Sequence, residues 1–111
     1  MQNLDLSERH LHMLLDILAH HVPHAEVWVF GSRINGMSHE GSDVDLVLRN
    51  PTNLDGTTPA WADLREALEE SNLPMLVDLH DWARLPEAFH KEIQRHHVVL
   101  QAPLAPNLSG G

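Results

Sequence analysis

The stretch DVDLVLR, which begins at Asp43, constrains the fold most, because polar and apolar side chains alternate along it. Successive side chains of a β-strand point to opposite faces of the sheet. Val44, Leu46 and Leu48 should therefore share a face that lies under helices. Asp43 and Asp45 then point together from the other, open face, with roughly 6 to 7 Å between them. Two like charges at this distance repel unless a divalent cation lies between them.

The remaining chain alternates between helical and strand patterns, which predicts an α+β fold with a small mixed β-sheet flanked by helices. Ser7 should cap the first helix, and Pro23 prevents that helix from continuing. A turn and a brief helical segment are expected over residues 31–36. The predicted helices cover residues 7–21, 58 to about 72 and 86–95, and the predicted strands cover 27–30, 43–49, 75–80 and 98–100.

Composition narrows the class of protein. Seven Lys and Arg against sixteen Asp and Glu give a formal charge of −9, which disfavours binding to nucleic acid or to anionic membranes. Because the chain has no Cys, only His and carboxylates can ligate a metal. The sequence has no signal-peptide pattern and no apolar run of transmembrane length. We therefore expect a cytoplasmic protein with one domain over residues 1–101 and a flexible tail over residues 102–111.

A third carboxylate, Asp78, lies on the predicted strand 75–80 and points away from the face of its neighbours Val77 and Leu79. If this strand lies beside the strand that contains Asp43 and Asp45, three aspartates converge. Oxygen ligands of this kind favour Mg²⁺ or Mn²⁺ over zinc.

The residues after the first predicted strand are suited to bind an anion. Gly31 permits a tight turn, and Ser32 offers a hydroxyl and backbone N–H groups at the start of a short helix. Arg33 adds a cation that can reach a phosphate, and Gly36 allows close approach of the backbone. A phosphate cradle beside a carboxylate-bound metal predicts a site for a metal-bound nucleoside triphosphate.

These residues carry a family resemblance. Gly31 and Ser32, ten further residues, then Asp43 and Asp45, with Asp78 on a later strand, resemble the signature of polymerase-β-type nucleotidyltransferases. The resemblance implies the palm-like fold of that superfamily. It also implies two Mg²⁺ held by the three aspartates, which serve as the catalytic residues, and ATP as the substrate.

The length of the chain and further matches at Arg33, Gly36, Ser42 and Leu46 make it most similar to the minimal nucleotidyltransferases, which are often paired with HEPN toxins. The resemblance implies that Arg33, Gly36 and Ser42 help to bind the nucleotide. Since no acceptor-binding domain is recognisable, the acceptor should come from another protein. The resemblance implies that it is a tyrosine of a HEPN toxin, and that the chain acts as an antitoxin by adenylylating it. Such an antitoxin should form a hetero-oligomer with its partner, with a homodimer as the alternative.

Each assignment has a structural alternative. Asp43 and Asp45 could be ordinary solvent-facing strand residues, although their agreement with Asp78 argues against this. Ser32 is also suited to cap a helix, and Arg33 to form a surface ion pair. Ser42 is expected to position the backbone. The ten histidines favour surface or partner-facing positions over a zinc site.

Three functions follow from these observations. The first is an active nucleotidyltransferase that adenylylates its toxin. The second is a catalytically inactive antitoxin that neutralises its partner by binding alone. The third is a small acidic metal-binding module without transfer chemistry, which ATP binding would distinguish from the first.

Overall fold

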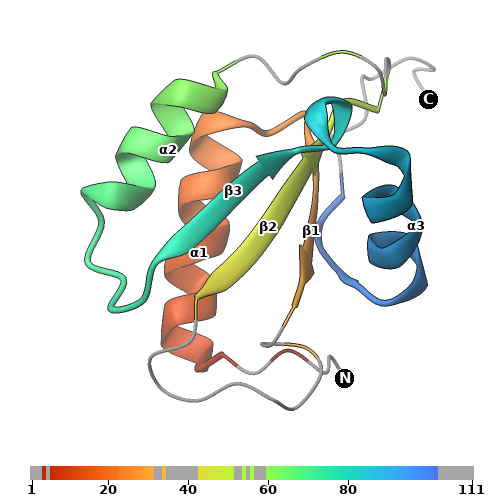
Figure 1. Cartoon of the computed structure of the whole chain (residues 1–111). Helices are drawn as coiled ribbons and strands as arrows, with labels where there is room; N and C mark the ends of the chain where they lie inside the picture. Colours follow the sequence, from red (N-terminus) through yellow and green to blue (C-terminus); the bar gives the residue numbers. More distant parts are fainter. Residues whose placement is uncertain are drawn as a thin grey trace, which may run out of the picture.

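A computed structural model describes residues 4, 6–31, 34, 43–51, 54, 56 and 60–102, which form a four-stranded sheet with helices on both faces (Figure 1). The strand order is β3-β2-β1-β4, where β2 and β3 run parallel and the other pairs run antiparallel. The predicted α+β class and mixed sheet are confirmed. In chain order the elements are α1 (Glu8–His21), β1 (Glu26–Phe30), β2 (Val44–Arg49), α2 (Trp61–Glu69), β3 (Val77–Asp81), the 3₁₀ helix η2 (Trp82–Arg84), α3 (Glu87–Arg95) and β4 (Val98–Gln101).

Helix α1 begins where the sequence predicts. Ser7, whose backbone is extended, caps the helix, and its hydroxyl accepts a hydrogen bond from the backbone N–H of His10 at 3.2 Å. Leu14 and Leu18, four residues apart, are buried on the side of the helix that packs against the sheet. None of the described helices has the length and apolar composition needed to cross a lipid bilayer.

Helix α2 is shorter than predicted. Its expected start at residues 58 and 59 lies outside the described residues, and the helix begins at Trp61 after Ala60, which has a left-handed φ of 65°. The helix ends at Glu69. The Ser71 hydroxyl donates a hydrogen bond to the Leu68 carbonyl at 2.7 Å, so the side chain satisfies a carbonyl at the end of the helix.

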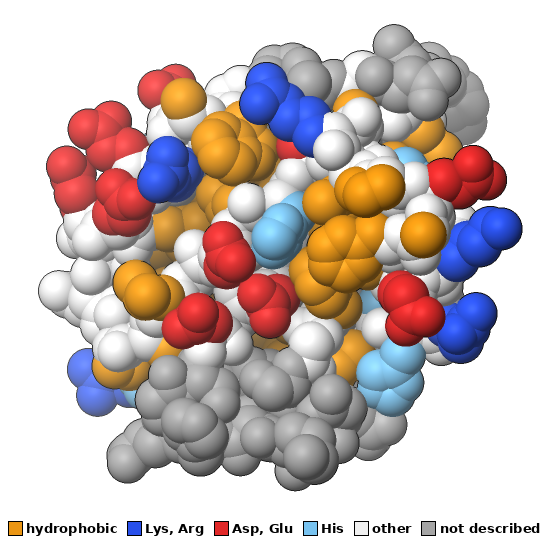
Figure 2. All heavy atoms as spheres, in the orientation of Figure 1, with side chains coloured by type: hydrophobic (Ala, Val, Ile, Leu, Met, Phe, Trp, Pro, Cys, Tyr) orange, Lys and Arg blue, Asp and Glu red, His pale blue; other side chains and the backbone are white. Residues whose placement is uncertain are grey.

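The sheet is buried on both faces along part of its length. Helices α1 and α2 cover one face, where Leu46 and Leu48 are fully buried as predicted. Val47 points to the opposite face and is also fully buried, because η2 folds over β2 on that side. The expectation that this face is open is therefore wrong at Val47. Figure 2 shows that acidic side chains and a histidine remain exposed on this face between hydrophobic ones.

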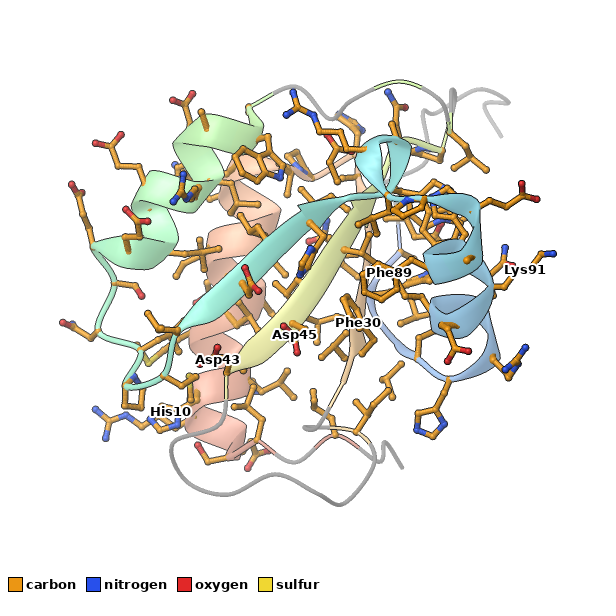
Figure 3. The ribbon with its side chains drawn as sticks, viewed as in Figure 1. His10, Phe30, Asp43, Asp45, Phe89 and Lys91 are labelled. Carbon is orange, nitrogen blue, oxygen red and sulfur yellow. The ribbon has the colours of Figure 1, made fainter. Side chains whose placement is uncertain are left out.

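Helix α3 packs beside β1 on the same face as η2. Phe89 of α3 contacts Phe30 of β1, with the ring centroids 5.8 Å apart and the rings almost perpendicular (Figure 3). Ile93 continues the buried side of the helix. The predicted final strand is confirmed at the edge of the sheet, where β4 pairs with β1.

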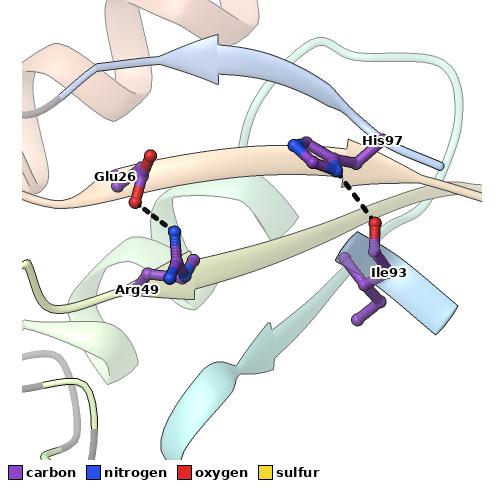
Figure 4. A network of polar contacts seen from close by, with 4 residues as sticks. All are labelled: Glu26, Arg49, Ile93 and His97. Carbon is purple, nitrogen blue, oxygen red and sulfur yellow. Dashed lines mark hydrogen bonds and ion pairs between the residues drawn. The ribbon is translucent and has the colours of Figure 1, made fainter. Parts of the chain in front are cut away.

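A tryptophan–arginine cluster, made of Trp28, Arg49 and Trp82, joins β1, β2 and η2. The Arg49 guanidinium carbon lies 4.0 Å from the Trp28 ring centroid and 4.6 Å from that of Trp82. Arg49 also donates a hydrogen bond to Glu26 Oε1 at 2.6 Å (Figure 4). On the other side of Trp28, the His97 ring stacks at 3.8 Å between centroids. This cluster holds η2 against the strands.

Candidate functional site

The predicted carboxylates lie on and around the N-terminal half of β2: Asp43 directly before the strand, Asp45 within it, and Asp78 on the neighbouring β3. Val44 and Leu46 point toward the helices and are fully buried, so Asp45 between them points the other way. β3 lies beside β2 as the prediction required, and Asp78 pairs directly with Asp45 in the parallel register. The two carboxylates therefore face the same side of adjacent strands.

A histidine completes this group. His80 follows Asp78 by two residues on β3, and its Nε2 lies 3.4 Å from Asp78 Oδ2. One ligand atom from each of Asp45, Asp78 and His80 lies within 4.8 Å of the others. The His80 side chain is 25% exposed and that of Asp78 is 57% exposed, so the group opens to solvent on the Asp78 side.

Gly31 closes the other side of Asp45. It follows β1 directly with φ of +88°, a conformation that favours glycine, which agrees with the tight turn predicted there. A Cβ atom at this position would lie only 2.5 Å from Asp45 Oδ2. The glycine thus has a second role that the sequence does not reveal, because it leaves the space that the Asp45 carboxylate fills.

The environment of Asp45 disfavours its charge. Burial raises the pKa of the Asp45 carboxyl above its ordinary value, and the nearby charges of Asp78 and Asp43 raise it further, whereas His80 opposes them. A cation bound close to this carboxylate would stabilise its charged form.

The donor set fits a divalent cation. Asp45 and Asp78 offer oxygen ligands in an electrostatically unfavourable pair, which suits Mg²⁺ or Mn²⁺. The nitrogen of His80 is a ligand that Mn²⁺ accepts more readily than Mg²⁺ does. The described geometry thus supports a cation between β2 and β3.

Asp43 lies at the edge of this arrangement. It is exposed just before β2, on the same side of the molecule as Asp45 (Figure 3). Among the described residues, the group within 4.8 Å contains His80 and not Asp43. The predicted convergence of three aspartates is therefore seen for Asp45 and Asp78, with Asp43 near enough to influence the Asp45 pKa.

The remaining predicted nucleotide-binding residues fall outside the described part of the chain. They are Ser32, Arg33, Gly36 and Ser42. Between them, Ile34 is described and buried, and its backbone N–H donates to the Gly31 carbonyl at 3.1 Å. His96 Nε2 lies 3.3 Å from the Ile34 carbonyl oxygen and so connects this turn to the end of α3.

Sequence reasoning missed His80. Its signal was the alternation of the strand itself, since a residue two positions after Asp78 points to the same face. The ring of His80 also lies against Phe30 and Phe89, with centroids 5.5 Å and 6.3 Å away. These contacts fix the imidazole beside the carboxylates.

Two recesses border the site. The α2–β3 groove is lined by residues 73–79, by Asp43, and by Trp61 and Arg65 of α2, among others. The second recess lies against Gly31 and α3, where Phe30 and Phe89 form part of its wall. The carboxylates thus lie between two hollows, with Asp78 lining the first and Gly31 the second.

The fold and the paired carboxylates beside a glycine turn define a nucleotidyltransferase. The chain belongs to the family described as polymerase beta, nucleotidyltransferase, whose sequence pattern matches residues 13–102. The probable protein adenylyltransferase MntA of Haemophilus influenzae is 41% identical to it over 98 residues, which cover 88% of this chain and 84% of the relative.

Two solved structures share the fold. One is described as a toxin–antitoxin with AMP-PNP, and it matches with a TM-score of 0.66 at 22% identity. The other is described as a mutant of the toxin–antitoxin MntA-HpeT, and it matches with a TM-score of 0.65 at 20% identity. Each match covers 83% of this chain and 73% of the solved chain.

Proposed function

We propose that this chain transfers AMP from ATP to a tyrosine hydroxyl of a HEPN-type toxin and thereby acts as its antitoxin. The observation that carries the proposal is the pairing of Asp45 with Asp78 on neighbouring strands, with Gly31, directly after β1, against the Asp45 carboxylate. The similarity to a relative named as a protein adenylyltransferase supports the reaction, and the toxin–antitoxin structures of the same fold support the partner. The activity belongs in the cytoplasm, in a hetero-oligomer with the toxin.

Three carboxylates would hold the metal ions. Asp45 and Asp78 would share them across the two strands, and Asp43 would add a ligand from the start of β2. Two Mg²⁺ bound there would supply positive charge to the α-phosphate and to the attacking oxygen. Burial and the charge of Asp78 raise the pKa of Asp45, and a bound cation would offset both effects by stabilising the charged carboxylate.

The chain's own groups orient and deprotonate the reactants. Asp78, the more exposed carboxylate of the pair, takes the proton of the tyrosine hydroxyl. The tyrosine oxygen then bonds to the α-phosphorus, while the bond from that phosphorus to the bridging oxygen breaks and pyrophosphate leaves with the electron pair. The turn that starts at Gly31 holds the departing phosphates, with contributions that we assign to Ser32, Arg33, Gly36 and Ser42.

The test is to incubate the chain with ATP, Mg²⁺ and its toxin and to measure the intact mass of both proteins. AMP should appear on the toxin and not on this chain. Asp78→Asn should reduce the rate by at least about 100-fold, because it removes the proton acceptor. Asp16→Asn changes the same charge on the exposed surface of α1 and should leave the rate unchanged.

The rival function is an antitoxin that only binds. It would be the better account if wild-type protein transfers no nucleotide with Mg²⁺ or Mn²⁺ while Asp45→Asn still neutralises the toxin in cells. Under the proposed function, Asp45→Asn should lose both transfer and neutralisation.

A further inference from the structure

The residues of the site form a line across the sheet that ends at β3. Phe30, which precedes Gly31, pairs with Asp45 on β2, and Asp45 pairs with Asp78 on β3. In the transfer of a phosphoryl group the attacking and leaving oxygens lie roughly in line with the phosphorus. If pyrophosphate leaves toward Gly31, the attacking hydroxyl must approach from the side of β3.

The α2–β3 groove opens at that place. It has a volume of about 680 Å³, and both Asp43 and Asp78 line it. Within the described part of the chain β3 pairs only with β2, so its outer edge has no strand partner. A free strand edge can take an extended segment through backbone hydrogen bonds, while alternate side chains give specificity.

The walls of the groove indicate the chemistry of its occupant. Leu76, directly before β3, is 71% exposed and is the most exposed large hydrophobic residue among those described. The lining of the groove carries three carboxylates, Asp43, Glu69 and Asp78, and one cation, Arg65. Helix α2 as a whole is acidic, as the red side chains around a single blue one show at the upper left of Figure 2. The charged residues of α2 and its C-cap are four carboxylates and one cation, namely Asp63, Glu66, Glu69, Glu70 and Arg65, of which Glu69 and Arg65 line the groove.

The only cation of the described helix α2 is itself paired. Arg65 Nε lies 3.4 Å from Glu69 Oε2, so the helix presents a net negative surface. A basic segment would therefore be attracted to the groove and an acidic one repelled from it. The formal charge of −9 on the whole chain acts in the same direction.

We propose that the α2–β3 groove docks the acceptor segment of the partner protein. The segment is extended and basic, lies along the outer edge of β3, places an apolar side chain against Leu76, and directs Lys or Arg toward α2. In this position its hydroxyl reaches Asp78 from the side opposite Gly31. This placement rests on the proposed transfer to a protein hydroxyl.

The experiment measures peptide binding to the full chain by fluorescence anisotropy without ATP. One labelled synthetic peptide carries a single tyrosine flanked by valines and lysines, and a second has glutamates in place of the lysines. The lysine peptide should bind, and the glutamate peptide should bind at least about tenfold more weakly. Leu76→Arg should lower the affinity for the lysine peptide by about tenfold or more, because it places in the groove a charge of the same sign as the lysines.

Val99→Arg is the matched control. Val99 is 47% exposed on β4, the outer strand at the opposite edge of the sheet, and its substitution adds the same charge. Affinity for the lysine peptide should be unchanged in this variant. The docking proposal is disproved if the lysine peptide does not bind, or if the Leu76→Arg and Val99→Arg variants bind it with equal affinity.

The groove and the proposed function can fail separately. If wild-type protein adenylylates its toxin and Leu76→Arg does so with an unchanged KM for the toxin, the docking groove is wrong and the function stands. If Leu76→Arg alone loses the peptide but wild-type protein transfers no AMP, the groove stands and the function is wrong.

Discussion

The charge on Asp45 should make stability depend on pH. A carboxyl with a raised pKa binds more protons in the folded chain than in the unfolded chain, over the range from its ordinary value of 3.8 up to the raised value. The free energy of unfolding therefore falls as pH rises through that range, and the loss is complete above the raised pKa. Asp45→Asn should remove this loss, so the variant should be more stable than wild type at pH 7 in EDTA.

Urea unfolding at several pH values measures this difference. The advantage of Asp45→Asn over wild type should shrink as the pH falls from the raised pKa toward 3.8 and vanish below 3.8, where the wild-type carboxyl is protonated in both states. Asp16→Asn controls for the change in net charge. A variant less stable than wild type at pH 7 would contradict the assignment of Asp45 as a destabilising charge.

Gly31→Ala should be costly for two separable reasons. A φ of +88° costs an alanine about 1 to 2 kcal/mol, and its Cβ would in addition meet the Asp45 carboxylate. Asp45→Ala removes that carboxylate and should relieve only the second cost. A double-mutant cycle of urea unfolding should give a coupling energy of at least about 0.5 kcal/mol, and additive effects would disprove the steric link.

At the scale of single residues, the sequence predicts those features that depend on local alternation. The facing of Asp45 and Asp78 follows from two strand patterns once the strands are assumed to be neighbours. The contact between Gly31 and Asp45 depends instead on how β1 and β2 pair, which no local pattern contains. His80 was detectable by alternation, but the abundance of histidines in the chain obscured it.

At the scale of the elements, the tryptophan–arginine cluster should fix η2 to the sheet. Arg49→Met keeps an apolar stem but loses the two cation–π contacts and the hydrogen bond to Glu26. The free energy of unfolding should therefore fall by about 1 to 3 kcal/mol. Arg65→Met is the control, because Arg65 is an exposed partner of Glu69 on α2 and should cost at most about 0.5 kcal/mol. Equal losses in denaturant unfolding would mean that the cluster contributes nothing specific.

The predicted elements differ from the observed ones where tertiary contacts act. Ser7 marks the start of α1 because its cap is local. The start of α2 follows Ala60 in a left-handed conformation, which no local propensity favours for alanine. The burial of Val47 could not be predicted either, because it depends on η2, which is distant in sequence and brings Trp82 edge-on to Trp28.

At the scale of the whole molecule, nucleotide binding should stabilise the fold. A ligand that binds only folded protein adds about 2.7 kcal/mol at 100 times its Kd, which should raise the Tm by roughly 10 °C. ATP with Mg²⁺ should produce this shift in wild type, and Asp45→Asn should abolish it. Calorimetric titration provides the check, since undiminished affinity of the Asp43→Asn, Asp45→Asn double variant for ATP with Mg²⁺ would exclude these carboxylates from the site.

Strand β2 is paired with a neighbour on each edge and is covered on both faces from Leu46 to Leu48. Backbone amides in such a strand exchange with solvent deuterium only when the whole domain opens, so they should be among the slowest to exchange. Asp45 is carried by this same strand. Asp45 therefore leaves its position only when the sheet itself opens. Heat should abolish catalysis and tertiary structure on a single time course.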